Sequence, residues 1–212
     1  MQLDPRKLWS AAESEFLKKI DSPHKIQLFL DDIEYNSVIE CQSPRWVIRK
    51  KRAHCFEGAL FAAACLKFHG GKPLIIDLKA ENDDDHVIAV YKFKNNWGAI
   101  AKSNFTTLRF REPVYRTIRE LVMSYFDFYF NLDGIKSLRS YSLPVNVDRM
   151  NIPGWAITDT DLDPLGHQLN SFRHFPVIRS AGIKKLSLAT ASLMKSSLLG
   201  SNPAGLYKAK KQ

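Results

Sequence analysis

The chain has 212 residues, of which 45% are hydrophobic and 25% are charged. This usage is typical of folded domains and excludes a chain that is mostly disordered. The net charge of +9 would suit a nucleic-acid-binding protein, but the basic residues are spread out, with local clusters at Arg45–Arg52 and Lys208–Lys211. The sequence shows neither a sustained basic helical stripe nor an aromatic strand pair for base stacking. A solvated basic surface is therefore the favoured interpretation, and nucleic-acid binding is the weaker alternative.

The lack of a recognisable secretory signal and the pattern of cysteines both favour a cytoplasmic location. The amino terminus has no apolar run after its charged residues, which argues against a secretory signal. The longest nearly unbroken apolar stretch, residues 58–66, is too short to span a bilayer. Cys41, Cys55 and Cys65 are an odd number without CxxC spacing, which argues against a disulfide framework and a structural zinc site. We therefore expect a soluble, cytoplasmic protein with no metal, no cofactor and no membrane partner.

Two helices are predicted at the start of the chain. Asp4-Pro5 is a helix-start signal, and apolar residues then recur at helical spacing, so residues 5–20 are predicted to form one amphipathic helix. Ser22-Pro23 repeats the signal and predicts a second helix. Residues 35–46 lack a clear periodicity and are expected to be irregular, with a turn at Ser43-Pro44.

The centre of the chain predicts a buried helix followed by a small antiparallel sheet. Residues 55–69 have a helical pattern that Gly70-Gly71 closes, and the apolar stretch inside it covers every face, as in a helix within a domain. An acidic loop, residues 79–85, separates the first two predicted strands. The strands are predicted at residues 74–78, 86–93, 97–102 and 106–110.

The rest of the chain is predicted to be mainly helical. Helices are expected at residues 114–129, 161–172 and 183–199, before a polar tail that we expect to fray. Helices followed by consecutive antiparallel strands indicate an α+β fold rather than repeated βαβ units. We expect residues 1–150 to form the core with its N-terminal helices, and residues 151–212 to form an appendage packed on that core.

Cys55 and His86 are the candidate reactive pair. Cys55 lies in the first turn of the buried helix, where the helix dipole and free N–H groups lower a thiol pKa and can stabilise an oxyanion. A nucleophilic cysteine also needs an imidazole that is near in space but distant in sequence. His86 opens a strand directly after the acidic loop, so its side chain can face a cleft. Cys55 as a small buried core residue is the alternative, and Cys65 is expected to be core.

Three segments carry a resemblance to a known family. Ala53-His54-Cys55-Phe56, with the alanine-rich helix behind it, resembles the nucleophile segment of the transglutaminase-like branch of papain-type cysteine enzymes. The segment 85–90 resembles the histidine strand of that family, and Trp97-Gly98-Ala99-Ile100 resembles the strand after its hairpin. The resemblance covers residues 51–105, about a quarter of the chain. It implies a papain-like core in which the Cys55 helix packs on the sheet. It also implies thiol-dependent hydrolysis or acyl transfer on an amide of a peptide or protein substrate.

The third member of the site departs from the family pattern. The family places an Asp or Asn on the strand after the hairpin, where it orients the imidazole, but the matching position holds Ala101. Asn104 is our preferred orienting residue, because its amide oxygen can accept from an imidazole N–H. Strand alternation favours Ser103 instead. The missing aspartate motivates an alternative function, in which an impaired enzyme scaffold serves as a peptide- or protein-binding module.

Overall fold

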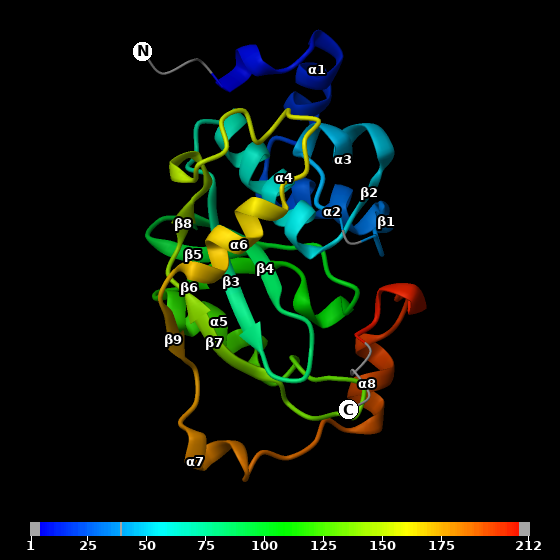
Figure 1. Cartoon of the computed structure of the whole chain (residues 1–212), viewed down its shortest axis with the longest axis vertical. Helices are drawn as coiled ribbons and strands as arrows, with labels where there is room; N and C mark the ends of the chain where they lie inside the picture. The colour runs from blue at the N-terminus through cyan, green and yellow to red at the C-terminus, as the bar shows by residue number, and fades with distance from the viewer. Residues whose placement is uncertain (1–4, 39, 208–212) are drawn as a thin grey trace.

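The computed structural model describes residues 5–38 and 40–207, so the predicted frayed tail and the cluster Lys208–Lys211 lie outside the described residues. Helices and one seven-stranded antiparallel sheet confirm the expected α+β class (Figure 1). The strand order is β6-β5-β4-β3-β7-β9, and β8 pairs with β3. The bounds are β3 (Leu74–Ala80), β4 (His86–Phe93), β5 (Asn96–Ile100), β6 (Arg111–Tyr115), β7 (Leu138–Ser142), β8 (Val145–Asn146) and β9 (His174–Pro176).

Helices cover both faces of the sheet. In Figure 1 the helices α1 to α4 lie at one end of the molecule, and α7 and α8 lie at the other. The strands β1 (Glu34–Tyr35) and β2 (Arg52–Ala53) form a separate parallel pair. The helices are α1 (Ala11–Lys19), α2 (Pro23–Asp32), α3 (Pro44–Lys50), α4 (Cys55–Phe68), α5 (Ile118–Phe126), α6 (Asp163–Ser171), α7 (Ser180–Ile183) and α8 (Ala191–Ser197). Short 3-10 turns are η1 (Pro5–Leu8), η2 (Thr106–Leu108), η3 (Val147–Arg149) and η4 (Pro203–Gly205).

The helix α4 is buried, as its all-round apolar sequence predicts. It packs on β4 and β3, with α2 and α3 beside it. The sheet separates two apolar cores, because successive side chains of a strand point to opposite faces. Val87 and Ala89 of β4 belong to the core that contains α4, whereas Ile88 and Val90 belong to the core that contains α5.

The first predicted helix is divided in two. The turn η1 ends at Leu8, and α1 begins after Ser10, whose hydroxyl accepts from the Glu13 N–H at 3.2 Å. The Glu13 carboxylate accepts in return from the Ser10 N–H at 2.9 Å, which completes a capping box that starts a new helix. The second helix begins at Pro23 as predicted. The segment predicted to be irregular, residues 35–46, contains the last residue of β1 and the first residues of α3.

The elements after β5 differ from those predicted, because pairing between strands overrides the local sequence pattern. Residues 106–110, predicted as a strand, contain the turn η2 instead. The strand β6 lies partly within the helix predicted over residues 114–129, because Tyr115 pairs with Trp97 and Arg111 pairs with Ala99 of β5. The helix predicted over residues 183–199 is wrong in its first half, because α7 ends at Ile183 and only α8 lies within the rest of the range.

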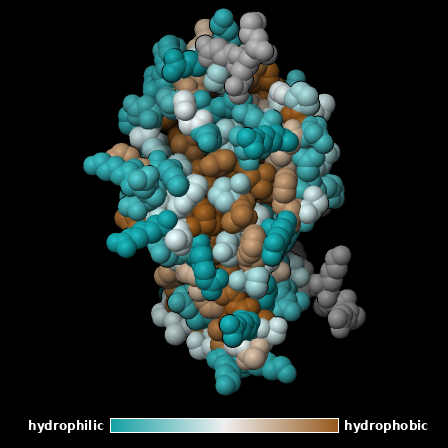
Figure 2. All heavy atoms as spheres, turned by 90° about the vertical axis from the view of Figure 1, so that its left-hand side faces the viewer, coloured by the Kyte–Doolittle hydropathy of each residue, from teal (hydrophilic) through white to brown (hydrophobic). Residues whose placement is uncertain are grey.

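The surface is mixed, and apolar side chains emerge between hydrophilic ones. Figure 2 shows a strip of apolar side chains on one face, flanked by hydrophilic groups. Among the residues that the structure describes, no helix is both long enough and apolar enough to cross a bilayer.

Candidate functional site

A cleft of about 580 Å³ lies at the first turn of α4. Both Cys55 and His86 line this cleft, as do Ser103 and Asn104. The structure therefore brings all four predicted site residues to one place. The other walls come from the start of the loop after β1, from the acidic loop, from Leu108 and Tyr129, and from a segment near the carboxyl end of the described chain, residues 204–207.

Cys55 is the first residue of α4, and the residue before it caps the helix. Nδ1 of the His54 ring accepts from the Phe56 N–H at 3.2 Å. The Cys55 side chain is partly exposed. The Cys55 thiol donates to the carbonyl oxygen of Asp85 at 3.8 Å. Burial raises the pKa of Cys55 to about 12, and the negative charge of Asp84 acts in the same direction. The thiol is therefore neutral in this structure.

His86 is fixed by a backbone carbonyl. Its Nε2 lies 2.9 Å from the carbonyl oxygen of Leu108. A carbonyl oxygen can only accept, so Nε2 carries the proton and the lone pair is on Nδ1. Burial lowers the pKa of His86 to about 4, and the positive charge of Arg111 lowers it further. The imidazole is therefore a neutral base whose ring orientation is set from Nε2.

The two side chains approach the cleft from different sides of the sheet. His86 follows the alternation of Ile88 and Val90, so its ring stands on the α5 side, edge-on to Tyr129 with 6.4 Å between ring centroids. Cys55 stands at the end of α4, on the opposite side. Both line the cleft near the beginning of β4. Within residues 5–38 and 40–207 no hydrogen bond joins the two side chains, and the thiol bonds Asp85 instead.

Asn104 is bonded to the C-terminal segment. Its Nδ2 donates to the Asn202 carbonyl at 2.8 Å, and its Oδ1 accepts from the Asn202 N–H at 2.7 Å. The hydroxyl of Ser103 accepts from the Phe105 N–H at 3.0 Å. The group that holds the His86 ring is thus the Leu108 carbonyl, and neither predicted orienting side chain occupies that place. A backbone carbonyl has no signature in a sequence, so the residue type at position 108 could not reveal it.

The buried carboxylate of Glu57 ties the cleft wall to the start of α4. Glu57 is fully buried, and its two oxygens accept from the Asn36 side-chain amide and from the backbone N–H groups of Gln42 and His54, each at 2.9 Å. These donors come from two segments that precede the helix. Glu57 therefore fixes the first turn of α4, where Cys55 lies, against the segments that precede it.

The acidic loop is less solvated than its sequence suggests. The Ser137 hydroxyl donates to Asp83 at 2.6 Å, and the Tyr129 hydroxyl donates to the Asp84 carbonyl at 2.7 Å. Burial raises the pKa of Asp83 to about 6. Asp83, Asp84 and Asp85 all line the cleft, so it carries negative charge along one wall.

The described residues form no metal-binding cluster, and the comparisons with protein families and curated proteins give no match. In the described ranges, no group of three or more His, Cys, Asp or Glu side chains is placed to hold a metal ion. The geometry of the cleft is therefore what supports a function.

Proposed function

We propose that the protein is a cysteine-dependent acyl-transfer enzyme that acts on an amide of a peptide or protein, with water as the favoured acceptor. The observation that supports this function is the shared cleft, in which a helix-initial thiol and a neutral imidazole with a free Nδ1 lone pair lie together. A nucleophile, a base and a group that orients the base are the three parts that such chemistry needs. Here they would be Cys55, His86 and the Leu108 carbonyl.

The proposed reaction starts from the neutral pair. Nδ1 of His86 takes the thiol proton as the sulfur of Cys55 attacks the carbonyl carbon of the substrate. The backbone N–H of Cys55, in the first turn of α4, donates to the resulting oxyanion. Collapse of the tetrahedral intermediate breaks the C–N bond, and the amine leaves with the proton of His86. Water then attacks the thioester, gives a proton to His86 and releases the carboxylic acid, and the proton returns to the sulfur.

The thiol must exchange partners before the reaction. In the structure it donates to the Asp85 carbonyl, on the strand end next to His86. A rotation about the Cα–Cβ bond of Cys55 would release that contact and turn the sulfur toward the cleft. Substrate that fills the cleft would favour this rotation, because the carbonyl carbon offers the sulfur a new partner.

The acidic wall indicates the charge of the substrate. Asp84 is exposed beside the cleft and favours a cationic group on a bound peptide, whereas Asp85 is already paired with Lys79 at 2.6 Å. We therefore propose that the preferred substrates carry lysine or arginine near the reacting amide. We also propose that α4 with β3, β4 and β5 corresponds to the core of transglutaminase-like enzymes, which the order of Cys55, His86 and the hairpin supports.

The acyl-enzyme can be tested with p-nitrophenyl acetate and intact-mass spectrometry. We expect the unaltered chain to gain one acetyl group, which peptide mapping places on Cys55. Cys55→Ala should gain none, and His86→Ala should be slower by about 100-fold or more. Cys65→Ala is the matched control, since Cys65 is fully buried, and it should react like the unaltered chain. Acetylation elsewhere, or equal rates with and without His86, would reject the proposal.

A second candidate function is a peptide-binding module without catalysis. It is favoured by the contact of the thiol with Asp85 and by the burial that raises the pKa of Cys55. The acetylation experiment separates the two functions. A chain that binds peptides in the cleft but never acquires an acetyl group on Cys55 is a module.

A further inference from the structure

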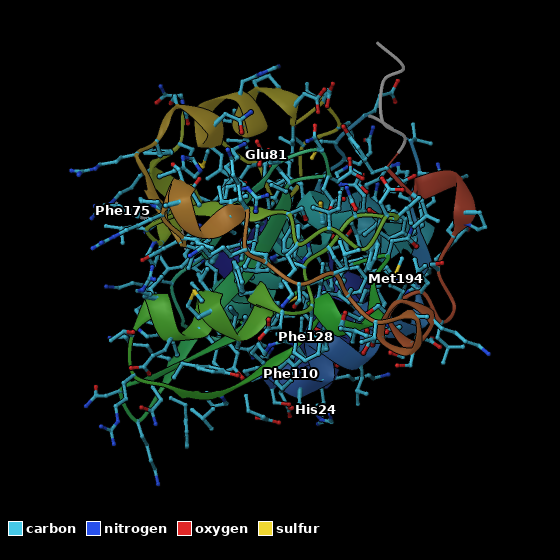
Figure 3. The ribbon with its side chains drawn as sticks, turned by 90° about the horizontal axis from the view of Figure 1, so that it is seen from below. His24, Glu81, Phe110, Phe128, Phe175 and Met194 are labelled. Atoms are coloured by element: carbon cyan, nitrogen blue, oxygen red, sulfur yellow. The ribbon has the colours of Figure 1, made fainter. Side chains whose placement is uncertain are left out.

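The segment after α8 lies against the mouth of the Cys55–His86 cleft. Figure 1 shows this segment in red, next to β1, and Figure 3 shows it on the same side of the molecule as α8, where Met194 is labelled. Residues 204–207 line the cleft directly. Part of the chain about 150 residues after the nucleophile therefore forms a wall of the site.

Asn104 holds the backbone of this segment in the way that a neighbouring strand would. One side-chain amide bonds both the N–H and the C=O of Asn202, at 2.7 and 2.8 Å. The Asn202 side chain adds a third bond, from Nδ2 to the carbonyl oxygen of Tyr35 at 3.2 Å. Its Oδ1 accepts from the Ala204 N–H at 3.0 Å and so sets the turn η4. Paired bonds to both backbone groups of one residue recognise a peptide chain independently of its side chain.

Gly205 fits against an aromatic ring with no space for a side chain. A Cβ at this position would lie 2.6 Å from Cε1 and 2.8 Å from Cδ1 of Tyr35. It would also lie 3.3 Å from Nδ2 of Asn104. The same two residues thus contact both ends of the segment 202–205. The Tyr35 carbonyl accepts from the Asn202 side chain, and the Tyr35 ring leaves no space for a side chain at position 205.

The helix α8, which precedes this segment, is held by other contacts. The Thr106 hydroxyl donates to the Ser196 carbonyl at 2.9 Å, and the Thr107 hydroxyl lies 2.9 Å from the hydroxyl of Ser197, which is fully buried. These contacts hold α8 on η2. They do not involve residues 202–205, so that segment can leave the cleft while α8 stays in place.

We propose that Tyr35 and Asn104 form a peptide-binding subsite of the Cys55–His86 cleft, which recognises an Asn-X-X-Gly segment and is occupied in this structure by residues 202–205 of the chain itself. The inference takes its cleft from the proposed function but needs none of its chemistry. Asn104 is then a residue that binds the peptide backbone, and the chain's own segment competes with peptides of the same class for access to Cys55.

Full-length variants test this subsite. The probe is a fluorescein-labelled peptide with the sequence of residues 199–206, followed by fluorescence anisotropy. Gly205→Val should expel the segment from the subsite by its contact with Tyr35, and this chain should bind the peptide at least about tenfold more tightly than the unaltered chain, which carries a tethered competitor. Adding Asn104→Ala should remove that gain. A peptide in which valine replaces the glycine is the matched control and should bind about tenfold more weakly.

The outcomes separate this inference from the proposed function. Equal peptide affinity for Gly205→Val and the unaltered chain, or a gain that survives Asn104→Ala, would overturn it. Should Gly205→Val fail to fold, Asn202→Ala in the full chain gives the same test, because it removes the bond to Tyr35 and the turn. If Cys55→Ala still binds the peptide and the unaltered chain is never acetylated on Cys55, the subsite is supported and the enzymatic function is rejected.

Discussion

The carbonyl oxygen of Leu108 lies 2.9 Å from Nε2 of His86, and this single backbone contact decides which imidazole nitrogen can act as a base. Leu108 ends the turn η2, which α8 covers from outside. The tautomer of His86 therefore depends on a loop rather than on a side-chain carboxylate. The first prediction follows from the burial of this ring.

Replacing His86 should change how stability depends on pH. The pKa of His86 in the folded chain, about 4, is below the usual value of 6.5. Between pH 4 and pH 6.5 the imidazole is therefore protonated in the unfolded chain and neutral in the folded chain. His86 thus favours folding fully above about pH 6.5, and the contribution falls as the pH drops toward 4. When the pH falls from 7 to 4, the free energy of unfolding should decrease by about 3 kcal/mol less in His86→Leu than in the unaltered chain. Urea unfolding at the two pH values measures this difference. The exposed His167→Asn is the control and should follow the unaltered chain.

Asp83 should show the opposite sign. Its folded pKa of about 6 is above the usual 3.8, so the folded chain keeps a proton that the unfolded chain loses. Stability from this group is present below pH 4 and is lost as the pH rises to about 6. Asp83→Asn retains an acceptor for the Ser137 hydroxyl, and its free energy of unfolding relative to the unaltered chain should be about 3 kcal/mol more favourable at pH 7 than at pH 4. Thermal unfolding at pH 4 and pH 7 measures this, and an equal effect at both values would contradict it.

Alkylation of Cys55 should show a thiol that is protonated at neutral pH. With a pKa of about 12, the rate with iodoacetamide at pH 7 should be lower than that of a free model thiol, and it should still rise at pH 10. Mass mapping identifies the alkylated residue. A plateau below pH 7 would instead indicate a thiolate–imidazolium pair in the resting chain.

Gly58 should tolerate no side chain. A Cβ there would lie 2.4 Å from Cβ of Lys102, where α4 crosses the end of β5. Gly58→Ala should cost about 2 kcal/mol or more, although alanine favours helices. Gly166→Ala in α6 is the matched control, since its Cβ would meet Phe56 at an ordinary 3.4 Å. Chemical unfolding should show the control unchanged or slightly more stable.

Removal of the Glu57 carboxylate should weaken the start of α4. Glu57→Ala leaves the Asn36 amide and the N–H groups of Gln42 and His54 without their acceptor in a buried place. We expect a loss of about 3 kcal/mol of unfolding free energy. The exposed Glu15→Ala should change the unfolding midpoint little, because its pair with Lys18 is at the surface. A Glu57→Ala chain as stable as this control would contradict the role of Glu57 in fixing the first turn of α4.

The sequence could predict elements whose signals are local. The helix that begins at Cys55 and the strand over 86–93 match their predicted positions, because an apolar run and a turn mark each of them. The strand β9 has three residues and exists through its pairing with β7, which no local pattern can reveal. The same holds for β6, where pairing with β5 replaced a helical pattern.

The lining of the candidate site was predictable to the same extent. Position in the helix and strand indicated Cys55 and His86, but strand alternation places His86 on the α5 side of the sheet. The segment 202–205 carries no catalytic residue type, so its place beside Asn104 could be recognised only from the folded chain.

The dipeptide Tyr35-Asn36 joins two distant parts of the molecule. The carbonyl of Tyr35 bonds Asn202 near the end of the described chain, and the side chain of Asn36 bonds Glu57 at the head of α4. Displacement of the C-terminal segment would thus break a bond to Tyr35, the neighbour of the residue that binds Glu57. The opening of the cleft and the support of the first turn of α4 are therefore linked through two adjacent residues.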